Sequence, residues 1–280
     1  MYKLVTKRVL SDVSTLFEVE APLVARKAKP GQFIILRIDE KGERIPLTIA
    51  DSDPERGTIT IIFQEVGLTT KCLAKKEAGE YIADFVGPLG KPMEFPEHPG
   101  RIIAVGGGVG IAPIYPKVKG FYKAGMDVFS IIGARTKDFL ILEDEMRLVS
   151  KELHVCTDDG SYGRHGFVSD LLQNFLADGE PIAEIIAVGP LPMMRAIVNQ
   201  TRPYGVKTVV SLNPIMVDGT GMCGACRVTV AGKTKFTCVD GPVFDGHQVD
   251  FDELVARSRM YQAEEKQALG HCRCGCGGEH

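Results

Sequence analysis

The segment MVDGTGMCGACRVTVAGKTKFTC, residues 216–238, carries the most informative spacing in this chain of 280 residues. Cys223 and Cys226 form a C-x-x-C pair, Cys238 follows after a short basic stretch, and Asp218 stands five residues before Cys223. With a cysteine at position 218 the order would be C-x4-C-x2-C…C, the spacing of plant-type [2Fe–2S] proteins. A carboxylate can replace one thiolate, because iron accepts oxygen as well as sulfur ligands. We therefore predict an iron–sulfur cluster held by Cys223, Cys226 and Cys238, with Asp218 as the candidate for its fourth ligand.

Two other interpretations of these cysteines stay open, a zinc ribbon and a reduced C-x-x-C pair without metal. A zinc ribbon normally has two C-x-x-C knuckles, and this segment has one. Gly219, Gly221 and Gly224 favour the cluster, since glycine lets the backbone pass close to inorganic sulfur without a Cβ clash. The chain ends in HCRCGCGGEH, residues 271–280, whose thiols and imidazoles could bind zinc, supply a fourth iron ligand or remain free.

Composition is that of an ordinary globular protein. Hydrophobic residues make up 44% and charged residues 25%, and the length suffices for two or three domains. The net charge of −3 gives no reason to expect nucleic acid or an anionic membrane as a partner. The first residues lack the apolar core of a signal peptide, and the eight cysteines lie mostly in two clusters rather than in a disulfide framework. We therefore expect a cytoplasmic protein without a membrane span.

Residues 1–98 have the pattern of short strands separated by turn residues, which predicts a small β-barrel. Turns are expected where Gly and Pro cluster, as at Pro30-Gly31 and Asp53-Pro54. Only Thr69–Lys76 has the pattern of a short helix. The expected strands are Tyr2–Leu10, Thr15–Glu20, Gln32–Ile38, Ile45–Ala50, Thr58–Val66 and Tyr81–Phe85.

Three pieces of this barrel suggest a flavin site. The strand Arg44-Ile45-Pro46-Leu47-Thr48 offers a cation for a pyrophosphate and a hydroxyl for the isoalloxazine edge. Gly67, Thr69 and Thr70 lie just before the short helix, where N–H groups and hydroxyls can hold phosphate. Gly87–Gly90 is expected to close the barrel. Each piece taken alone also fits a capped helix or a tight turn.

Residues 99–213 change to strands that alternate with helices, which predicts a parallel α/β domain covered on both faces. The first strand, Ile102–Val105, is continuously apolar, as buried parallel strands are. Later strands are expected at Asp127–Ile132, Leu153–Thr157, Ile185–Val188 and Thr208–Leu212. Helices are expected after the glycine loop to about Ala124, and near Leu142–Ser150, Phe167–Leu176 and Leu191–Thr201.

A nucleotide site is predicted where these strands end, because ligands of open α/β sheets bind at the carboxyl ends of strands. The first strand runs into GGGVGIAP, residues 106–113, where a pyrophosphate would meet bare N–H groups. Asp158 and Asp159 would favour NAD over NADP, because a carboxylate sits poorly beside the 2′-phosphate of NADP. Arg135 and Arg164 could instead bind such a phosphate. Ordinary βα loops are the alternative. The candidate residues of this site are Gly106, Gly107, Gly108, Gly110, Ala112, Pro113, Arg135, Asp158, Gly189, Pro190 and Met193.

The remaining chain is expected as a cluster segment over 214–245 and a helix with a Cys/His tail over 246–280. Asp250 followed by Glu253 resembles a capping box, which predicts a helix that begins there and runs to about Leu269. This helix is mostly polar, as in a solvated arm or an arm that docks on a partner.

The order of these parts resembles the ferredoxin–NADP reductase superfamily, and more closely the electron-transfer subunits of dihydroorotate dehydrogenase. The loop 106–113 is similar to the GGGxGxAP nicotinamide loop of that family. The arginine of Arg44–Thr48 stands one residue further from the hydroxyl than in the superfamily's R-x-Y-S. The resemblance covers most of the chain, through PGQF at 30–33, Arg44–Thr48, Gly87–Gly90, Gly106–Pro113 and Gly189–Met194.

Asp218 departs from the dihydroorotate subunits, which would carry cysteine there. An aspartate at this position is similar to the small subunits of NADH-dependent reduced ferredoxin:NADP oxidoreductases. That resemblance implies FAD, NAD(H) and one [2Fe–2S] cluster ligated by Asp218, Cys223, Cys226 and Cys238. It also implies a larger partner subunit with a second FAD, [4Fe–4S] clusters and the NADP(H) site, in an assembly that bifurcates electrons and reacts with ferredoxin.

We therefore expect an oxidoreductase subunit that relays electrons between NAD(H), FAD and the cluster. No catalytic side chain is expected, because the cofactors carry the chemistry. Three alternatives remain: the same cofactors with a dihydroorotate-oxidising partner, a zinc-binding regulatory module on a reductase scaffold, and a stand-alone NADH diaphorase. Asp218 argues against the first alternative, and the colour of the protein purified without oxygen would test the second.

Overall fold

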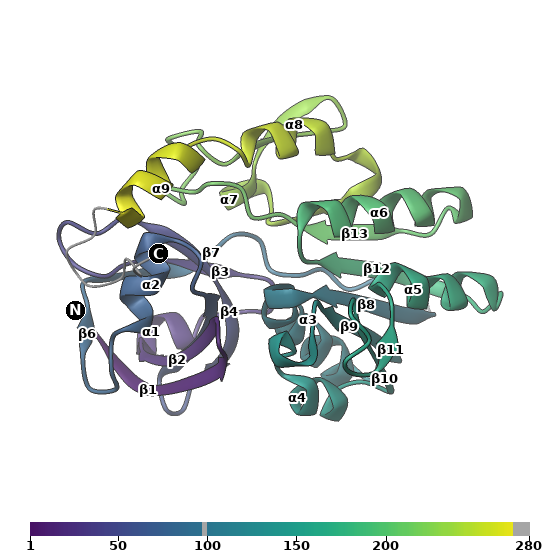
Figure 1. The fold of residues 1–280 in the computed structure, drawn as a ribbon, viewed down its shortest axis with the longest axis horizontal. Coiled ribbons are helices and arrows are strands. Elements are labelled where there is room, and N and C mark those ends of the chain that lie inside the picture. The colour runs from purple at the N-terminus through teal and green to yellow at the C-terminus, as the bar shows by residue number, and fades with distance from the viewer. Residues whose placement is uncertain (97–99, 271–280) are drawn as a thin grey trace.

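A computed structural model describes residues 1–96 and 100–270 of the chain. Figure 1 shows a rolled β-sheet at one end and a layered α/β sheet at the other, with the C-terminal segment lying across both. The expected N-terminal barrel, parallel α/β domain and C-terminal segment are all confirmed at this level. The Cys/His tail 271–280 lies outside the described residues.

The N-terminal sheet is antiparallel throughout and is nearly closed. Its strands are ordered β6-β1-β2-β5-β4-β3-β7. Residues 81–89 connect the two edges, because β6 pairs with β1 and β7 pairs with β3. The strands are β1 (Tyr2–Ser11), β2 (Ser14–Glu20), β3 (Phe33–Arg37), β4 (Ile45–Asp53), β5 (Thr58–Gln64), β6 (Tyr81–Ile82) and β7 (Asp84–Leu89), with the helices α1 (Pro22–Ala25) and α2 (Leu68–Ala74).

Successive side chains of a strand point to opposite faces of the sheet, so every second side chain of these strands lies inside the barrel. Phe17 of β2 and Phe63 of β5 lie in this core with ring centroids 5.9 Å apart. The expected strand Tyr81–Phe85 is wrong in one respect, since it breaks at Ala83. The Ala83 N–H donates to the carbonyls of Arg37 and Ile38, where the chain passes from one edge of the sheet to the other. Gly87 and Pro88 lie within β7, the last strand of this sheet, where the barrel is expected from the sequence to close.

The second sheet is ordered β11-β10-β9-β8-β12-β13-β16 and is parallel except for β16. Its core lies on both faces, with α3 and α4 packed on one side and α5 and α6 on the other. The strands are β8 (Arg101–Gly107), β9 (Val128–Ala134), β10 (Glu152–Thr157), β11 (Arg164–His165), β12 (Ile182–Val188), β13 (Thr208–Ser211) and β16 (Val243–Asp245). The helices are α3 (Ile111–Lys123), α4 (Glu143–Leu148), α5 (Val168–Ala177) and α6 (Leu191–Thr201). Short 3-10 turns lie at Gly108–Gly110, Lys137–Phe139, Arg202–Tyr204 and Gly246–Gln248.

The C-terminal segment adds a hairpin, β14 (Arg227–Val230) with β15 (Lys233–Phe236), and the helices α7 (Thr237–Asp240), α8 (Phe251–Arg257) and α9 (Gln262–Gly270). The same segment supplies β16, so it completes the sheet of the preceding domain. The expected N-cap is confirmed, since the Asp250 carboxylate accepts the Glu253 N–H at 2.9 Å. The single helix expected to Leu269 is wrong: Tyr261, at φ 65°, separates α8 from α9. Among the described residues, no helix has the length and apolar character needed to cross a membrane.

Candidate functional site

The predicted nucleotide residues lie where the strand order reverses. β8 lies between β9 and β12, and the helices after β8 and β12 pack on opposite faces of the sheet. The carboxyl ends of two such neighbouring strands leave a crevice between their loops. Gly107 ends β8, and Gly189 follows β12, so both glycine turns open at this crevice.

Close backbone approach explains why these turns consist of glycine. A Cβ on Gly107 would collide with Met193 Sδ, and a Cβ on Gly110 would lie 2.7 Å from Gly189 Cα and overlap the Val188 carbonyl. A Cβ on Gly189 would lie 2.6 Å from Met193 Cε. The structure thus brings Gly107, Gly110, Gly189 and Met193 together.

Gly108 completes this loop in a conformation that favours glycine, with φ +56° and no neighbouring atom within 4 Å of a Cβ placed there. Its backbone therefore borders free space, as a phosphate-binding turn requires. Ala112 is buried and Pro113 half-buried in the first turn of α3. Pro190 is the residue that precedes α6, so the second turn also leads into a helix.

The other two nucleotide candidates follow the next strands along the sheet. Arg135 follows β9 and Asp158 follows β10, and the Asp158 N–H donates to the Ala134 carbonyl at 3.0 Å. The neighbouring Asp159 carboxylate accepts the Ser161 hydroxyl at 2.7 Å and the Ser161 N–H at 2.9 Å, and these bonds lower the pKa of Asp159. Arg135 and these two aspartates therefore follow the carboxyl ends of β9 and β10, at the same edge of the sheet as the glycine turns.

The predicted flavin strand lies in the middle of the barrel sheet. Pro46, Leu47 and Thr48 pair with residues of β3, Thr48 with Phe33, and all three are half-buried. Arg44 is exposed just before β4. The strand is therefore positioned by main-chain pairing, and its outward side chains remain accessible.

The second flavin candidate, the turn at the start of α2, is joined to this strand by a carboxylate. The Thr69 hydroxyl donates to Glu43 Oε2 at 2.7 Å, and Glu43 directly precedes Arg44. The Thr70 hydroxyl accepts the Gly67 N–H at 3.1 Å and donates to the Gly67 carbonyl at 3.0 Å. The Thr69 hydroxyl thus donates to a carboxylate of the chain itself, as it could to an oxygen of a phosphate.

Two of the predicted cluster ligands meet in a buried position. Cys226 Sγ and Cys238 Sγ lie 3.2 Å apart, and each residue is 2% exposed. Two thiolates on one tetrahedral metal with bonds of about 2.3 Å would lie only slightly further apart. Burial, followed by the Cys226 sulfur, raises the pKa of the Cys238 thiol to about 12, so metal binding there must release a proton.

The other two ligands lie on the same loop without joining the pair. Among the described residues, no group of three or more His, Cys, Asp or Glu side chains is arranged to hold a metal ion. Cys223 is exposed. Asp218 Oδ2 accepts the Thr220 hydroxyl at 2.6 Å, the Thr220 N–H at 2.9 Å and the Met222 N–H at 3.2 Å. These bonds lower the pKa of Asp218, and the nearby charge of Arg44 adds to them.

The cluster loop lies directly on the barrel. Cys226 and Cys238 share a buried cluster with Phe33 and Ile35 of β3. A Cβ on Gly219, which has φ +85°, would lie 2.6 Å from Ile35 Cδ1 and 2.8 Å from Leu89 Cδ1. The donor set and this close approach fit a cluster held beside β3, the strand that pairs with the predicted flavin strand.

Sequence reasoning missed a buried lysine in the nucleotide domain. Lys117 on α3 is 1% exposed, and its Nζ has no hydrogen-bond partner among the described residues. Burial lowers its pKa to about 8, partly offset by the charge of Glu184. Glu184 is itself buried, which raises its pKa, and it forms an ion pair with Lys207 at 2.7 Å. The position of Lys117 among the apolar residues of α3 was the signal in the sequence that could have indicated its burial.

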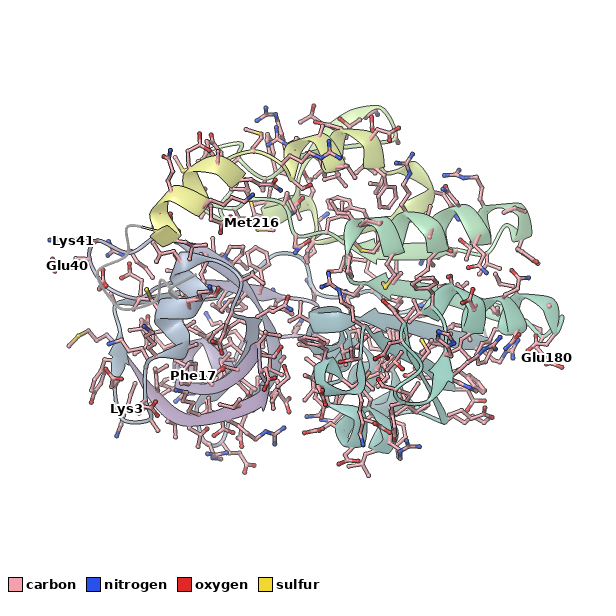
Figure 2. All side chains as sticks on the ribbon, in the orientation of Figure 1. Lys3, Phe17, Glu40, Lys41, Glu180 and Met216 are labelled. Carbon is pink, nitrogen blue, oxygen red and sulfur yellow. The ribbon has the colours of Figure 1, made fainter. Side chains whose placement is uncertain are left out.

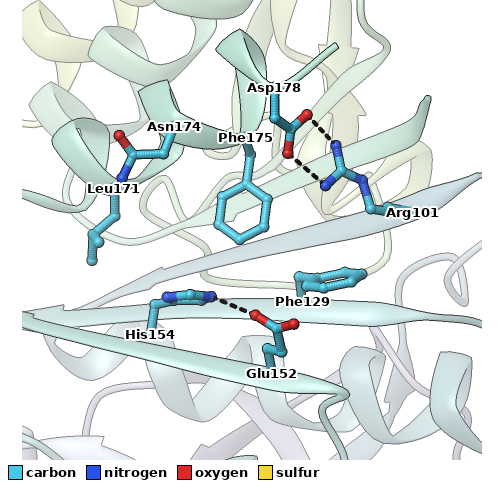
Figure 3. A pocket seen from close by; sticks show the side chains of 8 residues that line it. All are labelled: Arg101, Phe129, Glu152, His154, Leu171, Asn174, Phe175 and Asp178. Atoms are coloured by element: carbon cyan, nitrogen blue, oxygen red, sulfur yellow. Dashed lines mark hydrogen bonds and ion pairs between the residues drawn. The ribbon is translucent and has the colours of Figure 1, made fainter. Parts of the chain in front are cut away.

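One cavity of about 370 Å³ lies away from these sites, at the amino ends of β8, β9 and β10 (Figure 3). Arg101 binds the Asp178 carboxylate through two bonds of 2.7 and 2.8 Å. Its guanidinium also lies 5.6 Å from the ring centroids of both Phe129 and Phe175. We interpret this arrangement as a brace between α5 and the sheet rather than as part of the nucleotide site.

Comparison with known proteins agrees with this geometry. Residues 104–199 match an oxidoreductase NAD-binding domain, and residues 213–250 match the iron-sulfur cluster binding domain of dihydroorotate dehydrogenase B. A Thermotoga maritima protein named as a homolog of the dihydroorotate dehydrogenase B (NAD(+)) electron transfer subunit is 50% identical, over 89% of this chain and 88% of the relative. The electron transfer subunit of Geobacillus thermodenitrificans is 33% identical, over 88% of this chain and 96% of the relative.

Among solved structures, a chain of the NADH-dependent reduced ferredoxin-NADP oxidoreductase, described in connection with flavin-based electron bifurcation, superposes with a TM-score of 0.90. It is 46% identical, and the match covers 95% of this chain and 96% of that one. The chain therefore belongs to the family of dihydroorotate dehydrogenase B electron transfer subunits, and is an oxidoreductase subunit of the ferredoxin–NADP reductase type with an NAD-binding and an iron–sulfur binding domain.

Proposed function

We propose that this chain relays electrons between NAD(H), FAD and a [2Fe–2S] cluster, and passes them to a larger flavin and iron–sulfur subunit of an NADH-dependent ferredoxin:NADP oxidoreductase. The observation that carries this proposal is the contact of the buried Cys226–Cys238 pair with β3. Because β3 pairs with β4, this contact supports a thiolate metal site beside the predicted flavin strand. The similarity to the bifurcating oxidoreductase chain supports the choice of assembly.

The residues have separate tasks in this proposal. The glycine turns at 106–110 and 189 leave space for the NAD(H) pyrophosphate, and Asp158 faces the adenosine ribose. Thr48 and Arg44, with the turn 67–70, hold FAD. Asp218, Cys223, Cys226 and Cys238 hold the cluster. When bound, the nicotinamide and the flavin supply hydride transfer and the cluster supplies single-electron transfer, so this chain contributes orientation and distance.

A surface beside the cluster loop suits a protein partner. Met222 is 87% exposed, and Cys223 next to it is exposed as well. The apolar side chains of Ile215, Val217 and Val239 are 40–48% exposed on the same segment. Apolar side chains gathered around a redox centre are typical of an interface across which electrons pass, because they exclude water from the contact. We call these five residues the cluster-side surface.

Oxygen-free purification from the native cell, by a tag on this chain, tests the proposal. Recovery of a larger flavin and iron–sulfur subunit that reduces NADP would support it, and flavin and cluster absorption of the chain should accompany that subunit. A colourless chain that contains zinc would refute the cofactor assignment. A chain that carries both cofactors but emerges alone would reduce the function to an NADH diaphorase.

A second candidate is the electron transfer subunit of a dihydroorotate dehydrogenase, favoured by the family of its iron–sulfur domain. Recovery of a dihydroorotate-oxidising partner in the same purification would establish it. Asp218 argues against this candidate, because the resemblance to dihydroorotate subunits leads us to expect cysteine at that position.

We also propose a cytoplasmic location, as expected from the distribution of the cysteines.

A further inference from the structure

Helix α9 crosses from the C-terminal segment to the barrel and lies over α2 (Figure 1). Its Glu265 carboxylate reaches the turn that begins α2, since a Cβ on Gly67 would lie 2.5 Å from Glu265 Oε1. The turn therefore has Glu43 on one side, bound to the Thr69 hydroxyl, and Glu265 on the other. Two carboxylates from distant parts of the chain approach one small turn.

This turn belongs to the proposed flavin site, where its N–H groups and hydroxyls are proposed to hold a phosphate of FAD. A pyrophosphate and a carboxylate are both anions that seek the same donors, and like charges at short range repel each other. If Glu265 and the pyrophosphate both lay beside Gly67, their electrostatic repulsion would raise the free energy of the complex. One of them must withdraw when the other is present.

Helix α9 is built so that it can withdraw. None of its described side chains is buried, in contrast to α8, which buries Phe251 and Leu254. Segments with few buried apolar contacts open at low free energy. Tyr261, at φ 65°, separates the two helices, so α9 can swing about this residue while α8 stays in place.

The anchor of α8 lies on the cluster loop. Arg257, at the end of α8, donates to the Ala225 carbonyl at 2.8 Å, and Ala225 stands between two predicted cluster ligands. The chain that carries Glu265 is thus held at the cluster loop by α8, whereas the described part of α9 buries no side chain against the barrel. Movement of α9 need not disturb the loop.

We propose that α9 is a strap whose Glu265 carboxylate competes with the FAD pyrophosphate for the Gly67–Thr70 turn, so that FAD binding lifts α9 from the barrel. This proposal rests on the proposed function, because it takes the flavin site as given. The strap would slow the entry of FAD into the free subunit.

Anaerobic FAD titration of the full-length chain, freed of flavin and followed by flavin fluorescence, tests the strap. Glu265→Gln should bind FAD at least about five-fold more tightly, the lower end of the range for coupled sites, and with a faster association rate. Glu264→Gln, on the same exposed helix and next to the changed position, is the matched control and should bind FAD as the unchanged chain does. Hydrogen exchange over residues 262–270 should rise when FAD is added.

The outcomes separate the strap from the flavin site itself. No FAD binding by the unchanged chain would overturn the proposed function. FAD binding that is identical in the unchanged chain and both variants, with exchange in α9 unaffected by FAD, would overturn the strap alone. Weaker binding by Glu265→Gln would also overturn it, and would show that α9 clamps FAD rather than competing with it.

Discussion

Asp218 has two possible tasks that substitutions can separate. It holds its own loop through bonds to Thr220 and Met222, and it is the predicted oxygen ligand of the cluster. We expect Asp218→Ala to leave FAD bound but to make the cluster labile, with faster loss of iron to a chelator. Asp218→Asn keeps an oxygen acceptor for the loop but loses the anionic ligand, so an altered electron paramagnetic resonance spectrum in this variant would identify ligation.

The control for Asp218 is Asp218→Cys, which completes the plant-type set of four thiolates and should retain the cluster with a changed spectrum. If all three variants keep the spectrum and iron content of the unchanged chain, the ligand assignment is wrong. A ligand from the tail 271–280, which lies outside the described residues, would then be sought.

Gly110 tests the crowding at the nucleotide turns. In Gly110→Ala the new Cβ would meet the Val188 and Gly189 backbone, which cannot rotate away as a side chain can. We expect a loss of about 1–3 kcal/mol in the free energy of unfolding and slower flavin reduction by NADH, with FAD retained. Stopped-flow reduction and thermal unfolding measure the two effects. Gly120→Ala on α3, whose Cβ would meet only Met93 and Pro30 atoms at 3.2 Å or more, is the control and should leave NADH reduction unchanged.

Lys117 gives stability a dependence on alkaline pH. Its pKa falls from 10.5 to about 8 on burial, so between these values the unfolded chain binds more protons than the folded chain. The contribution of Lys117 to stability should therefore rise as pH increases from 8 to 10.5, by about 3 kcal/mol for this displacement, seen as the difference between the unchanged chain and Lys117→Met. Lys117→Met should remove the rise and be more stable at pH 7. Melting temperatures across this range measure it, with exposed Lys123→Met as control; a rise that persists in Lys117→Met would contradict the assignment.

At the residue scale, the sequence predicted which loops would meet at one edge of the sheet better than it predicted individual side-chain contacts between distant residues. The loops at Gly107, Gly110 and Gly189 meet as expected, because strands of a parallel sheet end at one edge; that they bind a nucleotide stays a prediction. The contact of Glu265 with Gly67 could not be foreseen, since it joins positions far apart through a helix with no apolar stripe. The buried Lys117 was also missed, because local patterns place a lysine at the surface.

At the scale of elements, α8 supports the cluster loop through the Arg257 side chain. Arg257→Ala removes the bond to the Ala225 carbonyl, which should cost about 1–2 kcal/mol of local stability. We expect faster release of iron to a chelator, with the flavin site unaffected. Arg259→Ala, two residues further along and outside this contact, is the matched control. Equal rates of iron release in both variants would show that the loop does not depend on α8.

Periodicity located most elements but not their interruptions. The alternating helices and strands of residues 99–213 follow the expected pattern closely, since burial on both faces leaves clear apolar runs. The break at Ala83 and the split at Tyr261 were missed, because each is decided by which distant element the chain must reach next. Helix α1, a single turn after Ala21, was too short to show a period.

At the scale of the whole molecule, the cluster-side surface should decide association with a partner. Met222→Glu places a charge at its most exposed apolar position, and burying that charge without a counter-ion is costly. We expect association at least about ten-fold weaker, or about 1.4 kcal/mol, with FAD and cluster content unchanged. Leu148→Glu, at a residue 76% exposed on α4, is the control. Sedimentation or co-purification with the partner measures the difference, and equal association of both variants would place the interface elsewhere.

Because β16 pairs antiparallel with β13, the nucleotide domain depends on the C-terminal segment for its last strand. A chain that ended before residue 243 would leave β13 as an open strand edge, with unpaired N–H and C=O groups that invite a second molecule to pair. Removing the iron–sulfur segment, by mutation or in the course of evolution, would therefore create an aggregation-prone nucleotide domain unless another strand covered that edge. The same segment thus carries the predicted cluster ligands and keeps the nucleotide domain from aggregating, so losing one function would also lose the other.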